Sequence, residues 1–160
     1  MNHLPNFHGC FVCGDRNSSG LNVRFSIEGD RVVTHYCPGE DKMGFMGLTH
    51  GGVLAALLDE TMGWAPALIH RRFGVTVELT VKYLRPVAVG TELTISGWSS
   101  GGHRRIWEAE GEIVDAKGVV CAKGKGKYMA MSADRSIDVM KYLTFYDGCV
   151  EPSMISGVMP

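Results

Sequence analysis

The sequence lacks any strong excess of charge of one sign. Its 160 residues hold 16 lysines and arginines against 17 aspartates and glutamates, and the formal net charge is −1. Without a basic excess there is no long-range field to draw the chain to nucleic acid or to an anionic membrane. We therefore expect neither a nucleic-acid partner nor a membrane partner.

A secretory signal and a membrane-spanning run are also missing. Residues 1–5 contain no basic stretch followed by an apolar one. The longest apolar stretch, residues 53–69, is interrupted by Asp59 and Glu60, which makes it too short and too charged to cross a bilayer. Together these absences predict a cytoplasmic protein.

The cysteines do not form an even set. There are five, and without an export signal an odd count indicates reduced thiols rather than a disulfide framework. Cys10 and Cys13 have the spacing of half a zinc site, and His8 and Cys37 are nearby candidate ligands. Because a second pair with this spacing is absent, we predict no metal, and metal analysis of protein purified without added zinc tests this expectation.

What the sequence does contain is one strongly apolar helical segment. Residues 53–69 are apolar on nearly every side, which is typical of a helix surrounded by other structure. Thr49 is the predicted N-cap, and Pro66 is expected to kink or break the last turns. Before this helix, Gly29 and Asp30 predict a tight turn between two strands over residues 21–28 and 31–37.

Beyond the helix the hydrophobic period changes to two, which predicts strands over residues 75–83, 91–99, 104–114 and 119–131. Short turns between them favour antiparallel pairing. A weak helix near residues 136–143 and a tail follow. We predict one α+β domain over residues 1–160, with an irregular lead-in at 1–20 and a C-terminal extension at 133–160. Its antiparallel sheet of five to six strands wraps around one long central helix.

Two features of residues 49–60 can support chemistry. Gly51 and Gly52 open the helix, where backbone N–H groups lack partners and a ligand oxygen can approach closely, as an oxyanion site needs. Asp59 lies within the apolar helix, where a carboxylate can serve as a general base or a nucleophile. The alternatives are an ordinary glycine turn and a structural aspartate with a partner.

The spacing of these two features has a geometric consequence. Gly51 and Asp59 are separated by about 12 Å of helical rise, so one substrate carbonyl cannot contact both on a single helix. If both act on one substrate, they come from different chains. The sequence thus predicts a two-fold dimer in which each helix offers Gly51 to one site and Asp59 to the other.

The run His50-Gly51-Gly52, followed by Asp59, resembles the signature of hotdog-fold thioesterases of the PaaI (phenylacetyl-CoA thioesterase) type. Two further segments support the resemblance, which covers roughly residues 10–131: residues 75–86, which close in Tyr83-x-Arg85-Pro86, and Cys10-x-x-Cys13-Gly14. The resemblance implies a homodimer or a dimer of dimers that hydrolyses an acyl-CoA thioester. No cofactor is implied other than the coenzyme A of the substrate.

The same resemblance implies roles for individual residues. Asp59 would activate water or attack the acyl carbon, and the Gly51 N–H would hold the thioester oxygen. His50 would orient the substrate or the helix start, and Thr76 would position water. One departure is Gly44, which stands where many relatives carry asparagine or glutamine in the loop seven residues before the first motif glycine.

Three more residues are candidate substrate contacts. Gly52 lies at the helix opening. Lys125 belongs to a Lys-Gly alternation over residues 123–127, which in a strand places the lysines on one face and small residues on the other. Lys125 and Arg104 could meet the phosphates of coenzyme A, and a solvated charged face is the alternative.

The sequence leaves other functions and sites open. One alternative is a non-catalytic acyl-CoA-binding protein acting as a sensor or scaffold, which the missing amide at Gly44 favours. Another is a dehydratase or hydratase on a 3-hydroxyacyl thioester, for which His50 would be the histidine. Ser99 lies in a Gly-x-Ser-x-Gly pattern without the strand-turn-helix context of a nucleophile. Seven apolar residues could line an acyl pocket or belong to the core: Phe7, Phe11, Met43, Phe45, Met46, Met62 and Trp64.

Overall fold

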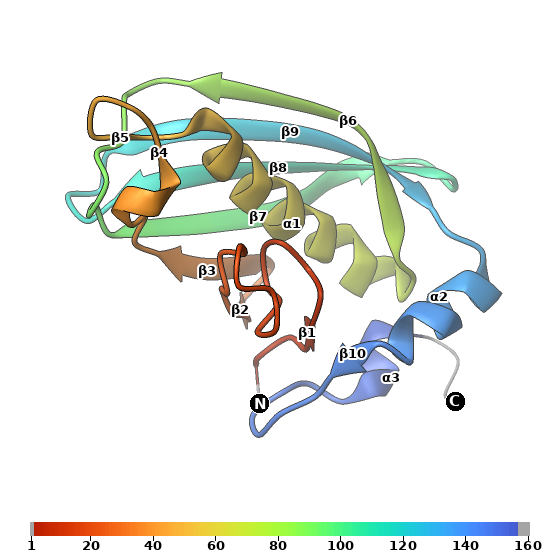
Figure 1. Ribbon diagram of the computed structural model, residues 1–160. Helices are drawn as coiled ribbons and strands as arrows, with labels where there is room; N and C mark the ends of the chain where they lie inside the picture. The colour runs from red at the N-terminus through yellow and green to blue at the C-terminus, as the bar shows by residue number, and fades with distance from the viewer. Residues whose placement is uncertain (1, 157–160) are drawn as a thin grey trace.

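The computed structural model describes residues 2–156. One sheet of six antiparallel strands, in the order β2-β3-β7-β8-β9-β6, lies against the long helix α1 (Gly51–His70) (Figure 1). In that order the strands span Phe25–Glu28, Arg31–Tyr36, Leu93–Gly102, Ile106–Asp115, Val120–Ala130 and Gly74–Tyr83. The predicted α+β architecture, a sheet wrapped around one long helix, is confirmed. Gly29, at φ +65°, forms the predicted turn between β2 and β3.

Three glycines allow α1 to approach the sheet closely. Gly97, Gly111 and Gly124 are paired in register across β7, β8 and β9. A Cβ on any of them would lie within 3.0 Å of an atom of Met62, which is fully buried on α1. The predicted division of β9 is also confirmed, because its glycines face the helix while Lys125 is exposed on the other face. The row of glycines therefore fixes the depth at which α1 lies.

The two ends of α1 differ from the sequence prediction. Thr49 is not the cap: it belongs to β5, and His50 caps the helix by accepting the Gly52 N–H on Nδ1 at 2.9 Å. Pro66 does not break the helix, which continues to His70. The packing of the buried Pro66 outweighs the cost of its missing backbone hydrogen bond, because packing contributes more to helix stability than intrinsic propensity does.

The prediction that this apolar stretch is too short and too charged to cross a bilayer was wrong on both counts, because α1 meets the criteria of length and apolar composition. Among the described residues, α1 is the one helix that is long and apolar enough, with 20 residues and 56% of its most apolar window buried. Core helices of soluble proteins meet the same criterion. Here α1 packs against the sheet and supplies much of the buried core.

The ends of the described chain are more ordered than predicted. The short strand β1 (Asn6–Phe7) of the lead-in pairs with β10 (Leu143–Thr144) of the C-terminal extension. The extension is therefore not a simple tail, and its Val150 and Ile155 are buried. The remaining elements are the 3-10 helix η1 (Glu40–Lys42), β4 (Met43–Phe45), β5 (Leu48–Thr49), α2 (Ala133–Met140) and α3 (Pro152–Ile155).

Strand β6 is an edge strand and is more exposed than the half-buried strand that its alternation predicts. It pairs with β9 on one side only. Val75 is 53% exposed, Val77 is 48% exposed and Tyr83 is 50% exposed. This strand lies at the margin of the sheet, where α1 covers less of its inner face. An apolar edge of this kind offers unpaired backbone groups and side chains to another chain.

Candidate functional site

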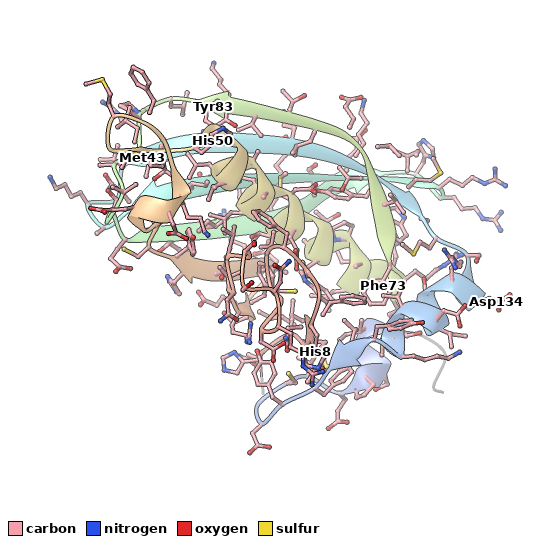
Figure 2. All side chains as sticks on the ribbon, in the orientation of Figure 1. His8, Met43, His50, Phe73, Tyr83 and Asp134 are labelled. Atoms are coloured by element: carbon pink, nitrogen blue, oxygen red, sulfur yellow. The ribbon has the colours of Figure 1, made fainter. Side chains whose placement is uncertain are left out.

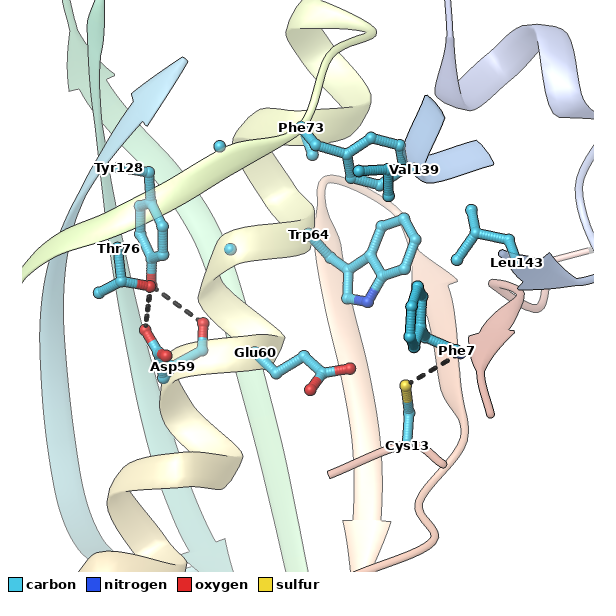
Figure 3. A pocket seen from close by; sticks show the side chains of 13 residues that line it. Phe7, Cys13, Asp59, Glu60, Trp64, Phe73, Thr76, Tyr128, Val139 and Leu143 are labelled. Atoms are coloured by element: carbon cyan, nitrogen blue, oxygen red, sulfur yellow. Dashed lines mark hydrogen bonds between the residues drawn. The ribbon is translucent and has the colours of Figure 1, made fainter. Parts of the chain in front are cut away.

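The Asp59 carboxylate, midway along α1, faces two hydroxyl groups of the sheet (Figure 3). Thr76 on β6 donates from Oγ1 to Asp59 Oδ1 at 2.9 Å. Tyr128 on β9 donates from its hydroxyl to the Asp59 backbone carbonyl at 3.0 Å and lies 3.4 Å from Oδ1. Thr76 and Tyr128 are partners in the β6–β9 register. The pairing of two strands therefore places both donors on one carboxylate.

Burial sets the electrostatics of this group. It raises the pKa of Asp59 above its ordinary value, and the hydrogen bonds from Thr76 and Tyr128 act in the opposite direction. Burial, followed by the neighbouring Asp59 charge, also raises the pKa of Tyr128, so this hydroxyl keeps its proton and remains a donor. A carboxylate with a raised pKa is a stronger base than an exposed one.

A cavity of about 250 Å³ lies beside Asp59. Its wall is largely apolar, and the residues that line it include Trp64 of α1, Phe73, Phe7 of the lead-in and Leu143 of the C-terminal extension (Figure 3). The Trp64 and Phe73 rings meet edge to face at 5.8 Å between centroids. The site thus offers an apolar chamber with a carboxylate on its wall.

Glu60 lines the same cavity, but its side chain points away from Asp59, toward the lead-in loop (Figure 3). There the Cys10 thiol donates to Glu60 Oε2 at 2.9 Å. Burial raises the pKa of Glu60 to about 8. The sequence marks Cys10 and Cys13 as a pair, but the contact with Glu60 joins residues 50 positions apart and has no local signal.

The start of α1 forms a second, separate arrangement. The Gly52 N–H is occupied by His50, and the Tyr83 hydroxyl donates to the Gly51 carbonyl at 2.7 Å (Figure 2). The Gly51 N–H, in contrast, has no hydrogen-bond partner within residues 2–156. Gly51 lines a cavity of about 220 Å³ that does not include Asp59. In one chain, the free backbone donor and the carboxylate therefore belong to different cavities.

Gly44 lies directly against the helix start. A Cβ at this position would come within 2.9 Å of His50 Cα and 3.0 Å of His50 Cδ2. An asparagine or glutamine cannot occupy Gly44 in this conformation without moving the loop. The absence of a side-chain amide here is therefore part of how the loop packs.

The structure does not bring the two candidate phosphate contacts to Asp59. Arg104 is exposed in the turn between β7 and β8. Lys125 lies on the outer face of the sheet and pairs with Glu110 at 2.8 Å. Neither residue lines the cavity beside Asp59.

Of the seven apolar candidates, Phe7 and Trp64 line the cavity beside Asp59. Met62 belongs to the core, whereas Phe45 is 70% exposed and Met46 is 83% exposed. Ser99 lies within β7 and donates to the Glu108 carbonyl at 3.4 Å, which is a strand position rather than a nucleophile elbow.

Comparison with known families and sequences places these features in context. Residues 46–122, which include α1 and β6, match the family model of the thioesterase superfamily. An uncharacterised protein of Schizosaccharomyces pombe is 28% identical over 111 residues. That alignment covers 65% of this chain and 62% of the relative, so the chain spans less than two thirds of the relative's length.

Solved structures share the fold. A thioesterase superfamily protein of known crystal structure superimposes with a TM-score of 0.70 at 27% identity, covering 76% of this chain and 63% of its own. The Escherichia coli PaaI protein from the phenylacetic acid degradation operon gives a TM-score of 0.66 at 21% identity, covering 74% and 86%. A Streptococcus mutans protein bound to acetyl CoA gives 0.64 at 20% identity, covering 69% and 90%.

Proposed function

Because residues 46–122 match the model of the thioesterase superfamily and the chain has the hotdog fold, we propose that it hydrolyses an acyl-CoA thioester to the free acid and coenzyme A. The observation that carries this proposal is the partly buried Asp59 carboxylate, oriented by two hydroxyls on the wall of an apolar cavity. The acetyl CoA in the Streptococcus mutans relative supports coenzyme A thioesters as the substrate class.

In the proposed reaction, the acyl group occupies the apolar cavity and its carbonyl carbon lies near Asp59. Asp59 either removes a proton from the attacking water or attacks the carbon itself. Thr76 and Tyr128 hold the reacting carboxylate in a single orientation. The negative charge that develops on the thioester oxygen is stabilised by the unpartnered Gly51 N–H at the positive end of a helix dipole.

We further propose that each active site is shared between two chains of a homodimer, or of a dimer of dimers. Two features support this assembly. Gly51 and Asp59 open into different cavities of one chain, about 12 Å apart along α1. In addition, the edge strand β6 leaves Val75 and Val77 exposed, next to Thr76 of the site. A two-fold contact near this edge would cover these side chains and complete both sites.

Gly51→Pro is the sharpest probe of the shared site. Proline at the first helical position removes the N–H and fits the helix start, and the extended backbone of His50 (ψ 132°) suits a residue before proline. Gly51→Ala adds the same Cβ beside Tyr83 but keeps the N–H, so it serves as the matched control. We expect a loss of about 10²-fold in kcat for the proline variant and a much smaller loss for alanine.

Mixing variants then tests whether the site is shared. Chains carrying Asp59→Asn and chains carrying Gly51→Pro should each be nearly inactive, but a mixed dimer concentrates both defects in one site and leaves the other intact. Re-associated equimolar mixtures should recover about a quarter of wild-type activity. If subunit exchange is shown but activity stays at background, both groups act within one chain and the shared site is wrong.

The first experiment on the reaction itself measures free thiol released from phenylacetyl-, benzoyl-, hexanoyl- and decanoyl-CoA. Turnover that disappears in Asp59→Asn, with acyl-CoA still bound, is the expected result. Binding without turnover in the wild type would instead indicate the sensor or scaffold function, which the packing of Gly44 against His50 favours. The dehydratase alternative has less support, because His50 caps its own helix.

We also propose that Arg104 and Lys125 contact the phosphates of coenzyme A, with Arg104 as the stronger contact because Lys125 is already paired with Glu110. Gly52 contributes to substrate binding through the shape of the helix start, since its N–H is occupied by His50. The reduced cysteines are consistent with the cytoplasmic location that we propose, and cell fractionation tests it.

A further inference from the structure

A cluster on the Glu60 side of α1 is not used by the proposed reaction. Cys10 Sγ, Cys13 Sγ and a Glu60 carboxylate oxygen all lie within 4.8 Å of one another. Zinc is bound by cysteine sulfur and carboxylate oxygen at about 2.0–2.3 Å, so the ligands of a tetrahedral site are separated by roughly 3–4 Å. The 2.9 Å between Cys10 Sγ and Glu60 Oε2, and the 4.8 Å limit on all three separations, approach this spacing although the atoms come from a loop and a helix.

The lead-in loop is shaped around the two sulfurs. The N–H groups of Val12 and Cys13 point at Cys10 Sγ, at 3.2 and 3.5 Å, and the Phe7 N–H donates to Cys13 Sγ at 3.4 Å. Backbone donors of this kind stabilise electron-rich sulfur. Gly14 completes the turn, since a Cβ there would lie 2.3 Å from the Cys10 carbonyl oxygen. The loop therefore presents both cysteines to one point.

Glu60 supplies the third candidate ligand atom. Its carboxylate is partly buried, and it receives the Cys10 thiol as a hydrogen-bond donor at 2.9 Å. A proton thus lies between two atoms that are both good ligands for zinc. Replacing protons with a divalent cation leaves the sulfur and oxygen atoms in place and compensates negative charge that is costly to bury alone.

The neighbouring histidine is not available as a fourth ligand. His8 uses Nδ1 for Asp15 and Nε2 for the Thr144 hydroxyl, the latter at 2.6 Å. Cys13 and Glu60, however, both line the cavity beside Asp59. A water molecule or a thiol could reach the cluster from this side. Three protein ligands with one exchangeable position are a common zinc arrangement.

We propose that Cys10, Cys13 and Glu60 form a binding site for one Zn²⁺ ion, with a fourth position open to the cavity. The ion fastens the lead-in loop, including Phe7, to α1 and so supports one wall of the chamber. The proposal does not depend on thioester hydrolysis, because the site could bind the cation in an enzyme or in a non-catalytic binding protein. It replaces the sequence-based expectation of no metal, which considered only cysteine and histidine spacing.

Cobalt is the most direct probe. Protein stripped of metal and kept reduced is titrated with Co²⁺, and Zn²⁺ is then added as a competitor. One equivalent of cobalt per chain should give thiolate-to-cobalt absorption and the intense visible bands of a four-coordinate ion, and one equivalent of zinc should abolish both. Weak bands without thiolate absorption would show that the cluster is not the site and would overturn the proposal.

Three variants locate the ion. Cys13→Ser and Glu60→Gln should each weaken zinc binding about a hundredfold or more, because changes to groups that only support a ligand already cost 10–100-fold. Cys37→Ser, which removes an exposed cysteine outside the cluster, is the matched control and should bind as the wild type does. If Cys13→Ser fails to fold, Glu60→Gln decides the question. Unchanged zinc affinity in Glu60→Gln would refute the three-ligand site.

Discussion

Asp59 and Glu60 lie on two sides of α1, and the groups that contact their carboxylates differ in chemistry. These carboxylates are adjacent in sequence and about 100° apart around the helix. On one side, Asp59 receives hydroxyl groups from strands that are held in register by the sheet. On the other, Glu60 meets the sulfur of an irregular loop. The comparison shows that the environment of a carboxylate depends on which element faces it, since both lie in the same apolar helix.

The largest expected difference is between Asp59→Asn and Glu60→Gln. We expect Asp59→Asn to lower kcat by about 10³-fold or more, because the proposed general base or nucleophile is lost while the shape of the side chain is kept. Glu60→Gln should lower kcat by about tenfold or less, through a loosened cavity wall. Steady-state thiol release, with acyl-CoA binding measured separately, compares the two. Equal losses of kcat would show that the two sides are not functionally distinct.

Removing the hydroxyl groups should have the next largest effect, and only on the Asp59 side. Thr76→Val removes the hydroxyl that orients the Asp59 carboxylate, and because misplacing a reacting group lowers the rate, kcat should fall roughly 10–100-fold. Tyr128→Phe should in addition lower the free energy of unfolding by about 1–3 kcal/mol, because the Asp59 carbonyl loses its donor. Zinc affinity should stay unchanged in both variants. A weaker zinc site in Thr76→Val would mean that the two sides are coupled.

Displacing α1 should affect both sides together. An alanine at Gly97 would place a Cβ 2.8 Å from backbone atoms of Thr61 and Met62, so the helix must move. Overpacking of this kind costs about 1–3 kcal/mol of stability. Thermal or denaturant unfolding measures that loss. The control is Gly9→Ala, where the nearest atom is 3.9 Å away and the change should stay within about 0.5 kcal/mol.

The smallest effects are expected far from both sides, at the basic residues. Arg104→Ala should raise KM for acyl-CoA about three- to tenfold, and Lys125→Ala by less, because Lys125 sits in an exposed ion pair with Glu110 that is worth little on its own. The rate at saturating substrate, kcat, separates a binding defect from a chemical one. If neither variant changes KM, the phosphates bind elsewhere and the lysines only form a solvated charged face.

The sheet and its long helix could be predicted because their signals are local. Alternation with a period of two located the long strands, and an apolar run located α1. The N-cap of α1 was predicted wrongly, because the ring nitrogen of His50 accepts the hydrogen bond that a threonine hydroxyl normally accepts at such a position. The exposure of β6 was missed because a sequence does not reveal which strand lies at the edge.

The site could be predicted only in part. Asp59 stood out as a charge in an apolar helix, and the resemblance pointed to Thr76. Tyr128 could not be found, because it reaches Asp59 only through the β6–β9 register. The link from Cys10 to Glu60 was equally hidden, since it depends on how a turn of the lead-in loop packs against the helix. Contacts between distant segments leave no pattern within either segment.

The pairing of β1 with β10 has a consequence for how substrate preference could diverge. Phe7 and Leu143 are register partners and both line the cavity. Neither lies within residues 46–122, the part that matches the family model. The chamber can therefore be resized by substitutions in two peripheral segments while α1 stays constant. Descendants of one ancestral gene could acquire new acyl preferences in this way without first sacrificing catalytic competence.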